Sequence, residues 1–428
     1  MSTKKGYKLV PWLFGKEIEI PEEWEVKKLE EVGEIIGGGT PDSTNKDFWN
    51  GDILWAVPTD ITKLQVNQIE NTERKITKLG LENSSAKLLP AKTILITSRA
   101  TIGECAITTK PITTNQGFQN IICNDKHNNY LIFYLIKHFP NNLLRLSQGT
   151  TFLEINKNQM KKVIVPISND IKEQQKIATI LSNVDSLIDS TSKIIKNSKS
   201  LKTGLMQKLL TRGIGHSKFK TIMLLYKKYL QVPESWSVLT GEKIFKLSSG
   251  VSPSEIVFRD DGDCLFVQVD DMNTPENKKE IVTSKLKFNS YKNQKIIVNE
   301  TERIVFPKRG VAILGNKVRK LTKKSTVDPN IMMVDCDNSI IPDFFYYFLS
   351  FLKLSHLIES AGVPQLNNKD LYPRNFLKPS LPEQQKIASI LSNIDAQINS
   401  QTQYKEKLER LKKSLMQKLL TGEVRVAI

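Results

Sequence analysis

The sequence predicts an α+β protein: two mixed α/β domains, each followed by a long helix, with the two helices packed as an antiparallel coiled coil. Three observations support this fold class: a long internal repeat, apolar stripes at helical spacing within it, and short β-branched runs before each copy. The repeat comes first, because it sets the architecture that other elements must fit. The predicted parts are a first domain at 1–168, a first helix at 169–212, a connector with the second domain at 213–378, and a second helix with a tail at 379–428.

The repeat is a stretch of 39 residues that occurs twice without a gap. Glu173–Thr211 and Glu383–Thr421 share 22 of 39 residues at a constant offset of 210, and both end in LMQKLLT. The identity extends to polar positions, which packing in a common core would not require. Two equivalent binding surfaces are therefore predicted on the helices. The candidate partner-docking residues are Gln174, Gln175, Gln207, Lys208, Gln384, Gln385, Gln417 and Lys418.

Each copy of the repeat has the pattern of one long helix. Apolar residues recur mostly at steps of three and four, as in Ile387, Leu391 and Ile394, and neither copy contains a proline. Such a stripe is typical of a coiled-coil seam or a bundle face. At 1.5 Å per residue each copy would be about 58 Å long. A helix of this length cannot bury its stripe alone, so we expect the two copies to pack on each other.

The segments before the two helices share several short motifs, but their sequences differ between these motifs. IPEEWEV (20–26) corresponds to VPESWSV (232–238), GGTP (38–41) to GVSP (250–253), and GDILW (51–55) to GDCLF (262–266). Short β-branched runs cut by Gly, Pro and Asn lie between these landmarks and predict mixed domains with irregular sheets. The two halves therefore share the order of their motifs and differ in the sequence between the motifs.

Composition limits the classes of function. Lys plus Arg is 62 against 45 for Asp plus Glu, which gives a net charge of +17 and favours polyanionic partners, nucleic acid above all. No stretch approaches the roughly 20 apolar residues of a membrane span, and no apolar segment follows the N-terminal lysines as in a secretory signal. Four widely spaced cysteines without a CxxC pair indicate buried free thiols in a reducing cytoplasm.

Motifs of catalysis are mostly absent. GVAILGNK (310–317) has the glycine spacing of a phosphate loop, but Asn316 displaces the lysine by one position, and Val318 then stands where a hydroxyl should ligate magnesium. The four histidines have no metal-ligand spacing among themselves or with the cysteines. We therefore predict a binding protein without catalytic residues, metal ligands or a cofactor of its own.

Taken together, these residues resemble the specificity subunit of Type I restriction–modification systems. The resemblance covers essentially the whole chain and depends on IPEEW and VPESW, GGGTP, the EQQKIA…ILSN helix starts, and the LLTRGIGHSKFK and LLTGEVRV ends. One departure concerns the proline-rich approach to each helix: SLPEQQ (380–385) keeps part of it, whereas SNDIKEQQ (168–175) does not. The start of the first helix is therefore left open.

The resemblance implies a mechanism. Each recognition domain reads one half of a split, asymmetric target in double-stranded DNA, and the paired helices set the gap between the half-sites. Each helix copy docks one methyltransferase subunit, so two identical partners bind a non-palindromic site. Those partners methylate adenine with S-adenosylmethionine, and motor–nuclease subunits that use ATP and Mg²⁺ join for cleavage.

Loops with small hydroxyl, amide and basic side chains are the expected DNA contacts. Most contacts in such interfaces go to phosphates, while Arg, Asn and Gln suit guanine and adenine edges in the major groove. The candidates are Thr40, Arg99, Asn115, Gln116, Thr150 and Thr151 in the first domain, and Lys308, Arg309, Lys317 and Arg319 in the second. Two alternatives stay open: a stand-alone DNA-modifying enzyme with degenerate motifs, and a coiled-coil DNA-binding protein without sequence preference.

Overall fold

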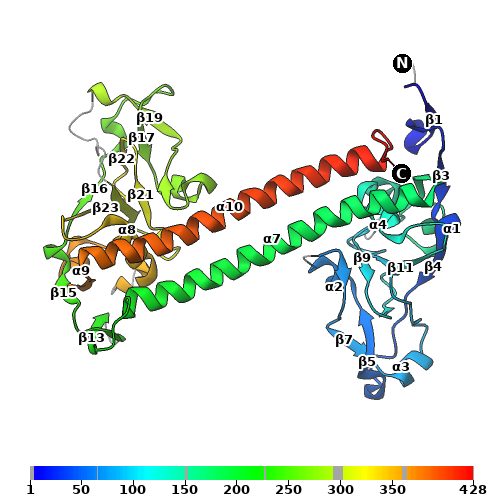
Figure 1. Cartoon of the computed structure of the whole chain (residues 1–428), viewed down its shortest axis with the longest axis horizontal. Helices are drawn as coiled ribbons and strands as arrows, with labels where there is room; N and C mark the ends of the chain where they lie inside the picture. The colour runs from blue at the N-terminus through cyan, green and yellow to red at the C-terminus, as the bar shows by residue number, and fades with distance from the viewer. Residues whose placement is uncertain are drawn as a thin grey trace. The chain divides into compact units, whose positions relative to one another are not determined.

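Figure 1 shows the protein as a computed structural model, which describes residues 4–64, 66–149, 153–225, 228–292, 302–358 and 364–427. The chain forms two compact units, one of residues 1–195 with 401–428 and the other of residues 196–400. We call them the first and the second unit. Each contains one globular domain and about half of each long helix.

The first unit contains a five-stranded sheet in the order β4-β11-β8-β9-β6 and a three-stranded sheet in the order β10-β5-β7. Two-stranded pairs β1-β2 and β12-β3 complete it. Its strands are β1 Tyr7–Pro11, β2 Glu17–Pro21, β3 Trp24–Lys28, β4 Gly33–Gly37, β5 Trp49–Ala56, β6 Gln68–Ile69, β7 Arg74–Ile76, β8 Ile94–Ile96, β9 Cys105–Thr108, β10 Thr113–Thr114, β11 Gln119–Cys123 and β12 Ile164–Ser168. Its shorter helices are α1 Leu29–Val32, α2 Pro58–Thr62, α3 Lys78–Glu82, α4 Asn129–His138, α5 Pro140–Leu144 and α6 Lys157–Lys161.

The second unit repeats this topology strand for strand. Its five-stranded sheet has the order β16-β23-β20-β21-β18, and its three-stranded sheet the order β19-β17-β22. Its strands are β13 Phe219–Leu225, β14 Lys228–Pro233, β15 Ser237–Thr240, β16 Phe245–Ser249, β17 Cys264–Val267, β18 Glu280–Ile281, β19 Leu286–Phe288, β20 Arg303–Pro307, β21 Arg319–Leu321, β22 Ser325–Val327, β23 Ile331–Cys336 and β24 Asn375–Lys378. Its shorter helices are α8 Pro342–Leu352 and α9 Asn368–Leu371.

The two long helices are α7, Ile171–Arg212, and α10, Leu381–Leu420. Asp170 accepts a hydrogen bond from Lys172 N (2.7 Å), so an acidic cap starts α7 where α10 has Pro382 in its first turn. This settles the start that the sequence left open. Gly213 and Gly422 follow the helix ends with φ of 64° and 73°, a left-handed conformation that suits glycine.

The main core of each unit joins its sheet to both long helices. In the first unit, the start of α7 (Ile177, Leu181) and the end of α10 (Leu419, Leu420) share a cluster with the sheet and with α4. In the second unit, the end of α7 shares a cluster with the start of α10 and α8. Within each unit the helices therefore run antiparallel, which confirms the predicted fold class. Among the described residues no helix is long and apolar enough to cross a bilayer.

Candidate nucleic-acid interface

Three turns meet beside the five-stranded sheet of the first unit. After β8 the chain turns at Arg99, where Ser98 N donates to Gly117 O (2.8 Å). Gly117 N donates in turn to Asn115 Oδ1 (3.0 Å), and Thr40 Oγ1 donates to Gln116 Oε1. Four of the predicted DNA contacts, Thr40, Arg99, Asn115 and Gln116, thus belong to one connected group of loops. We call it the first loop cluster.

Arg99 is held on the outside of the first loop cluster. Its Nε lies 2.8 Å from Glu154 Oε1, and both side chains are about half exposed. Ala100, the next residue, has a φ of 58°, which turns the chain sharply after the arginine. The predicted contacts Thr150 and Thr151 precede Glu154 and lie outside the described residues. The guanidinium can therefore exchange a solvated carboxylate for a phosphate or a base edge.

The second unit has a matching group of turns. After β20 the chain turns at Arg309, and Gly310 has a φ of 73° where Ala100 stands in the first unit. Lys308 N donates to Asn330 O (2.8 Å), and Asn330 N donates to Asp328 Oδ1 (2.6 Å), as Ser98, Gly117 and Asn115 do in the first unit. Arg309 forms a β-bridge with Gln365, the counterpart of the bridge between Arg99 and Glu154. This second loop cluster has the same frame with different side chains.

Charge distinguishes the two clusters. Lys308 donates through Nζ to Ser249 Oγ, and burial, together with the neighbouring Arg309, lowers the pKa of Lys308. Burial raises the pKa of the Asp328 carboxyl in the turn below. Two adjacent cations thus occupy the second cluster, whereas the arginine of the first is paired with a carboxylate. The two clusters therefore have the same backbone arrangement and carry different charged side chains.

The other two predicted contacts of the second domain have partners elsewhere. Lys317 Nζ donates to Asn273 Oδ1, and Arg319 donates to the carbonyl oxygens of Val318 (2.8 Å) and Met272 (3.0 Å). Burial lowers the pKa of Arg319. The structure places these two side chains against 270–273 rather than in the second loop cluster, so they differ in setting from Lys308 and Arg309.

The predicted docking residues fall into two groups. Gln174 and Gln384 are buried, and each anchors its helix to its own domain: Gln174 accepts from Asn128 N and Gln384 from Ile341 N, both at 2.8 Å. Their recurrence therefore has an explanation within the chain. The six exposed members of the set are Gln175, Gln207, Lys208, Gln385, Gln417 and Lys418.

Exposed apolar residues precede Lys208 and Lys418 at intervals of seven residues. Leu187, Ile194 and Leu201 are exposed at intervals of seven residues along α7, and Lys208 stands at the next interval. On α10 the equivalents of the last three are Tyr404, Leu411 and Lys418, which are also exposed. We call these seven residues the exposed stripes. Apolar side chains at a heptad interval are typical of a helix-packing face.

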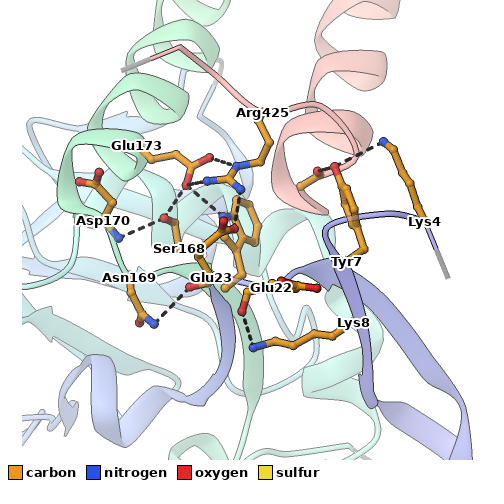
Figure 2. A network of polar contacts seen from close by, with 12 residues as sticks. Lys4, Tyr7, Lys8, Glu22, Glu23, Ser168, Asn169, Asp170, Glu173 and Arg425 are labelled. Atoms are coloured by element: carbon orange, nitrogen blue, oxygen red, sulfur yellow. Dashed lines mark hydrogen bonds and ion pairs between the residues drawn. The ribbon is translucent and has the colours of Figure 1, made fainter.

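Figure 2 shows how the start of α7 is fixed in the first unit. Glu173 is fully buried, and its carboxylate accepts from Trp24 Nε1 (3.0 Å), Ser168 Oγ (2.5 Å) and Arg425 (2.5 Å). In the second unit, Glu383 accepts from Trp236 Nε1 (2.9 Å), Ile214 N (2.9 Å) and His216 Nε2 (2.8 Å). Each carboxylate thus receives an indole N–H from its own domain and a group that follows the end of the other helix.

A second pair of contacts joins the helices to each other. Asp185 lies 2.5 Å from Lys412 and accepts from Tyr134 Oη (2.5 Å) in the first unit. Asp395 lies 2.6 Å from Lys202 and accepts from Tyr347 Oη (2.7 Å) in the second. Burial and the adjacent carboxylate raise the pKa of both tyrosines, so the hydroxyls remain donors. Sequence reasoning missed these four helix residues, although all lie among the identities of the repeat.

Comparison with known proteins decides the family. The pattern described as "Type I restriction modification DNA specificity domain" matches this chain twice, over residues 21–198 and 233–410. The chain belongs to this family. Each family match covers one globular domain from the strand after its first two-stranded pair, together with the greater part of the long helix that follows. The duplication inferred from the sequence is therefore that of the family domain.

Relatives of this family member match over nearly its full length. The Type I restriction enzyme MjaIX specificity subunit of Methanocaldococcus jannaschii is 31% identical over 421 residues, which cover 95% of each chain. The putative type I restriction enzyme MjaX specificity subunit of the same organism is 30% identical over 431 residues, again 95% of each. The crystal structure of the Type-I restriction-modification system S subunit from M. genitalium has the same fold, with a TM-score of 0.59, 15% identity, and coverage of 92% of this chain and 96% of that one.

Proposed function

We propose that this chain is the non-catalytic specificity subunit of a Type I restriction–modification enzyme, in which each globular domain reads one half of a bipartite DNA target. The observation that supports this most is the duplicated loop cluster, which places Arg99 and Arg309 on equivalent exposed turns of a basic protein. Exposed arginines suit both phosphates and guanine edges. Because the surrounding side chains differ, the two half-sites differ, and the target is asymmetric.

The long helices set the gap between half-sites and dock two methyltransferase subunits, one on each helix copy. Support comes from the exposed stripes and from the six exposed docking residues, which recur at equivalent positions of α7 and α10. Gln174 and Gln384 are left out of this surface because they are buried. The partner subunits supply the adenine methylation with S-adenosylmethionine, and motor–nuclease subunits supply cleavage with ATP and Mg²⁺. The chain itself uses no cofactor and works in the cytoplasm.

Mapping methylated adenines tests this proposal. The chain is produced with the methyltransferase subunits of its own system in a host without adenine methylation, and the host genome is sequenced for modified bases. We expect one bipartite motif with a fixed gap. Arg99→Ala should relax or weaken one half of this motif and Arg309→Ala the other, because each arginine lies in a separate cluster.

Three results would contradict the proposal. Methylation by the chain alone would identify a stand-alone enzyme. Equal binding of random and target DNA by the assembled complex would indicate a coiled-coil protein without sequence preference. A continuous motif, or one in which Arg99→Ala and Arg309→Ala alter the same half, would exclude two separate readers.

A further inference from the structure

An exposed arginine of the first unit lies over two indole rings. The Arg74 guanidinium carbon is 3.9 Å from the ring centroid of Trp49 and 4.9 Å from that of Trp55. The two indoles contact each other edge to face, with centroids 5.0 Å apart. Among the described residues, Arg74 has no carboxylate partner and its guanidinium makes no hydrogen bond. The N–H donors of the stacked guanidinium are therefore available to a ligand that binds from outside the chain.

This stack is attached to the first loop cluster. Trp55 Nε1 donates to Gly39 O (2.9 Å), and Trp49 Nε1 donates to Asp42 O (3.0 Å). These carbonyls flank Thr40, the residue that bonds to Gln116 in the cluster. The loop at 39–42 thus links the stacked arginine to the side chains proposed above as DNA contacts. The stack lies on the paired strands β5 and β7, which run side by side in Figure 1.

The second unit has an equivalent aromatic pair, and no cation lies over it among the described residues. Phe258 and Phe266 contact each other edge to face with centroids 5.1 Å apart, on the equivalent strand and its approach. Strand register identifies the missing partner: Trp55 pairs with Arg74 in the first unit, and Phe266 pairs with Leu286 in the second. The aromatic support is therefore common to both domains, and the arginine is peculiar to the first.

We propose that Arg74 reads a base edge, with guanine as its preferred base, in the half-site bound by the first domain. This inference rests on the proposed function. Two indoles hold the planar guanidinium against free rotation, which presents its paired donors in the geometry that the O6 and N7 acceptors of guanine require. A phosphate contact would carry no sequence information. Leu286 stands at the paired position of the second domain, so the side chain here belongs to the part of the frame that differs between the two domains.

To test this, the complete complex with Arg74→Leu is produced in a host without adenine methylation, and the methylated motif is determined. Leucine is the residue found at the paired position of the second domain. We expect discrimination at one G·C position of the first half-site to fall by about 10- to 100-fold, the size of one good bidentate contact. The other half-site and the gap should stay unchanged. Arg74→Lys keeps the charge without the planar fork, so it should relax the same position.

Lys78→Leu is the matched control, since it removes one exposed cation that follows the same strand, in α3. We expect it to leave the motif unchanged. A motif unaltered by Arg74→Leu, with methylation merely weaker at every site, would assign Arg74 to phosphate and overturn the proposal. Equal changes in both half-sites, or a change caused by Lys78→Leu, would overturn it as well. A wild-type chain without a bipartite motif would instead refute the proposed function.

Discussion

At the scale of single residues, the repeated polar positions serve two different purposes. Glu173 and Gln174, like Glu383 and Gln384, recur because they are buried or nearly so at the start of a helix and must find partners inside the chain. A buried polar group without a partner costs free energy, so both copies keep the side chain and its bonds. Gln207 and Lys208 recur although their side chains are exposed and make no hydrogen bond or ion pair with the described residues. Only burial separates an anchoring residue from a candidate docking residue.

The buried Glu173 carboxylate leads to a prediction for the C-terminal tail. Arg425→Ala removes the cation that donates to Glu173 at 2.5 and 3.1 Å, and should leave a buried charge with fewer partners. We expect local stability to fall by about 1–3 kcal/mol, because the buried Glu173 carboxylate loses a hydrogen-bond partner. The partial exposure of Arg425 keeps the loss within this range. Amide hydrogen exchange in 421–427 should become faster. Lys413→Ala, on the exposed face of α10, is the control, and equal exchange in both variants would argue against the anchoring role.

At the scale of elements, each long helix carries out two tasks on different faces. One face packs against the globular domain and the other helix, and there the Asp185–Lys412 and Asp395–Lys202 pairs hold the antiparallel register. These pairs are about one-quarter exposed or less, so solvent screens them only in part. The other face carries the exposed stripes. The two copies are identical at Asp185 and Lys202 on the first face and at Leu201 and Lys208 on the second, so each unit has the same register contacts and a similar exposed helix end.

Changing one docking face should remove one partner. Gln207→Ala combined with Lys208→Ala alters the exposed end of α7, and we expect the number of bound methyltransferase subunits to fall from two to one. Native mass spectrometry of the assembled complex measures this number directly. The same double change at Gln417 and Lys418 should release the other subunit. Equal loss of both subunits from either variant, with an unchanged melting temperature, would count against two separate docking surfaces.

At the scale of the whole molecule, the chain uses one strand topology twice and differs between the two copies in its loop side chains. Both globular domains have the same strand orders, and both clusters place an arginine before a residue with positive φ. Identical strand pairings fix where a loop emerges, whereas the loop side chains are free to differ. Recognition of two unlike half-sites therefore needs no new fold, only a second set of loop residues.

Lengthening both helices should change the gap and nothing else. Four residues inserted after Ile194 and four after Tyr404 fall at equivalent positions, so the Asp185–Lys412 and Asp395–Lys202 pairs both keep their register. At 1.5 Å per residue the helices grow by about 6 Å, which is about 2 base pairs of B-DNA. Methylation mapping should return the same half-site bases with a longer gap. Altered bases with an unchanged gap would refute the spacer role, and an insertion in one helix alone should abolish methylation.

The sequence by itself determined the duplication, the two long helices and the class of the domain before each helix, and it displayed the resemblance to the family. Periodicity and identity at a fixed offset are local or one-dimensional signals, so a single sequence displays them. It also predicted Arg99 and Arg309 as DNA contacts in corresponding regions of the two domains. Their equivalence residue by residue follows only from strand pairing between distant segments.

The tertiary structure decided what depends on contacts between residues far apart in the chain. It separated the buried Gln174 from the exposed Gln175, turned Arg319 toward backbone carbonyls, and placed Arg74 over Trp49 and Trp55. None of these follows from residue type, since an arginine has the same donors whether it faces solvent, a carbonyl or an indole. Strand register brings the partners together, and the partners determine which donors remain for DNA.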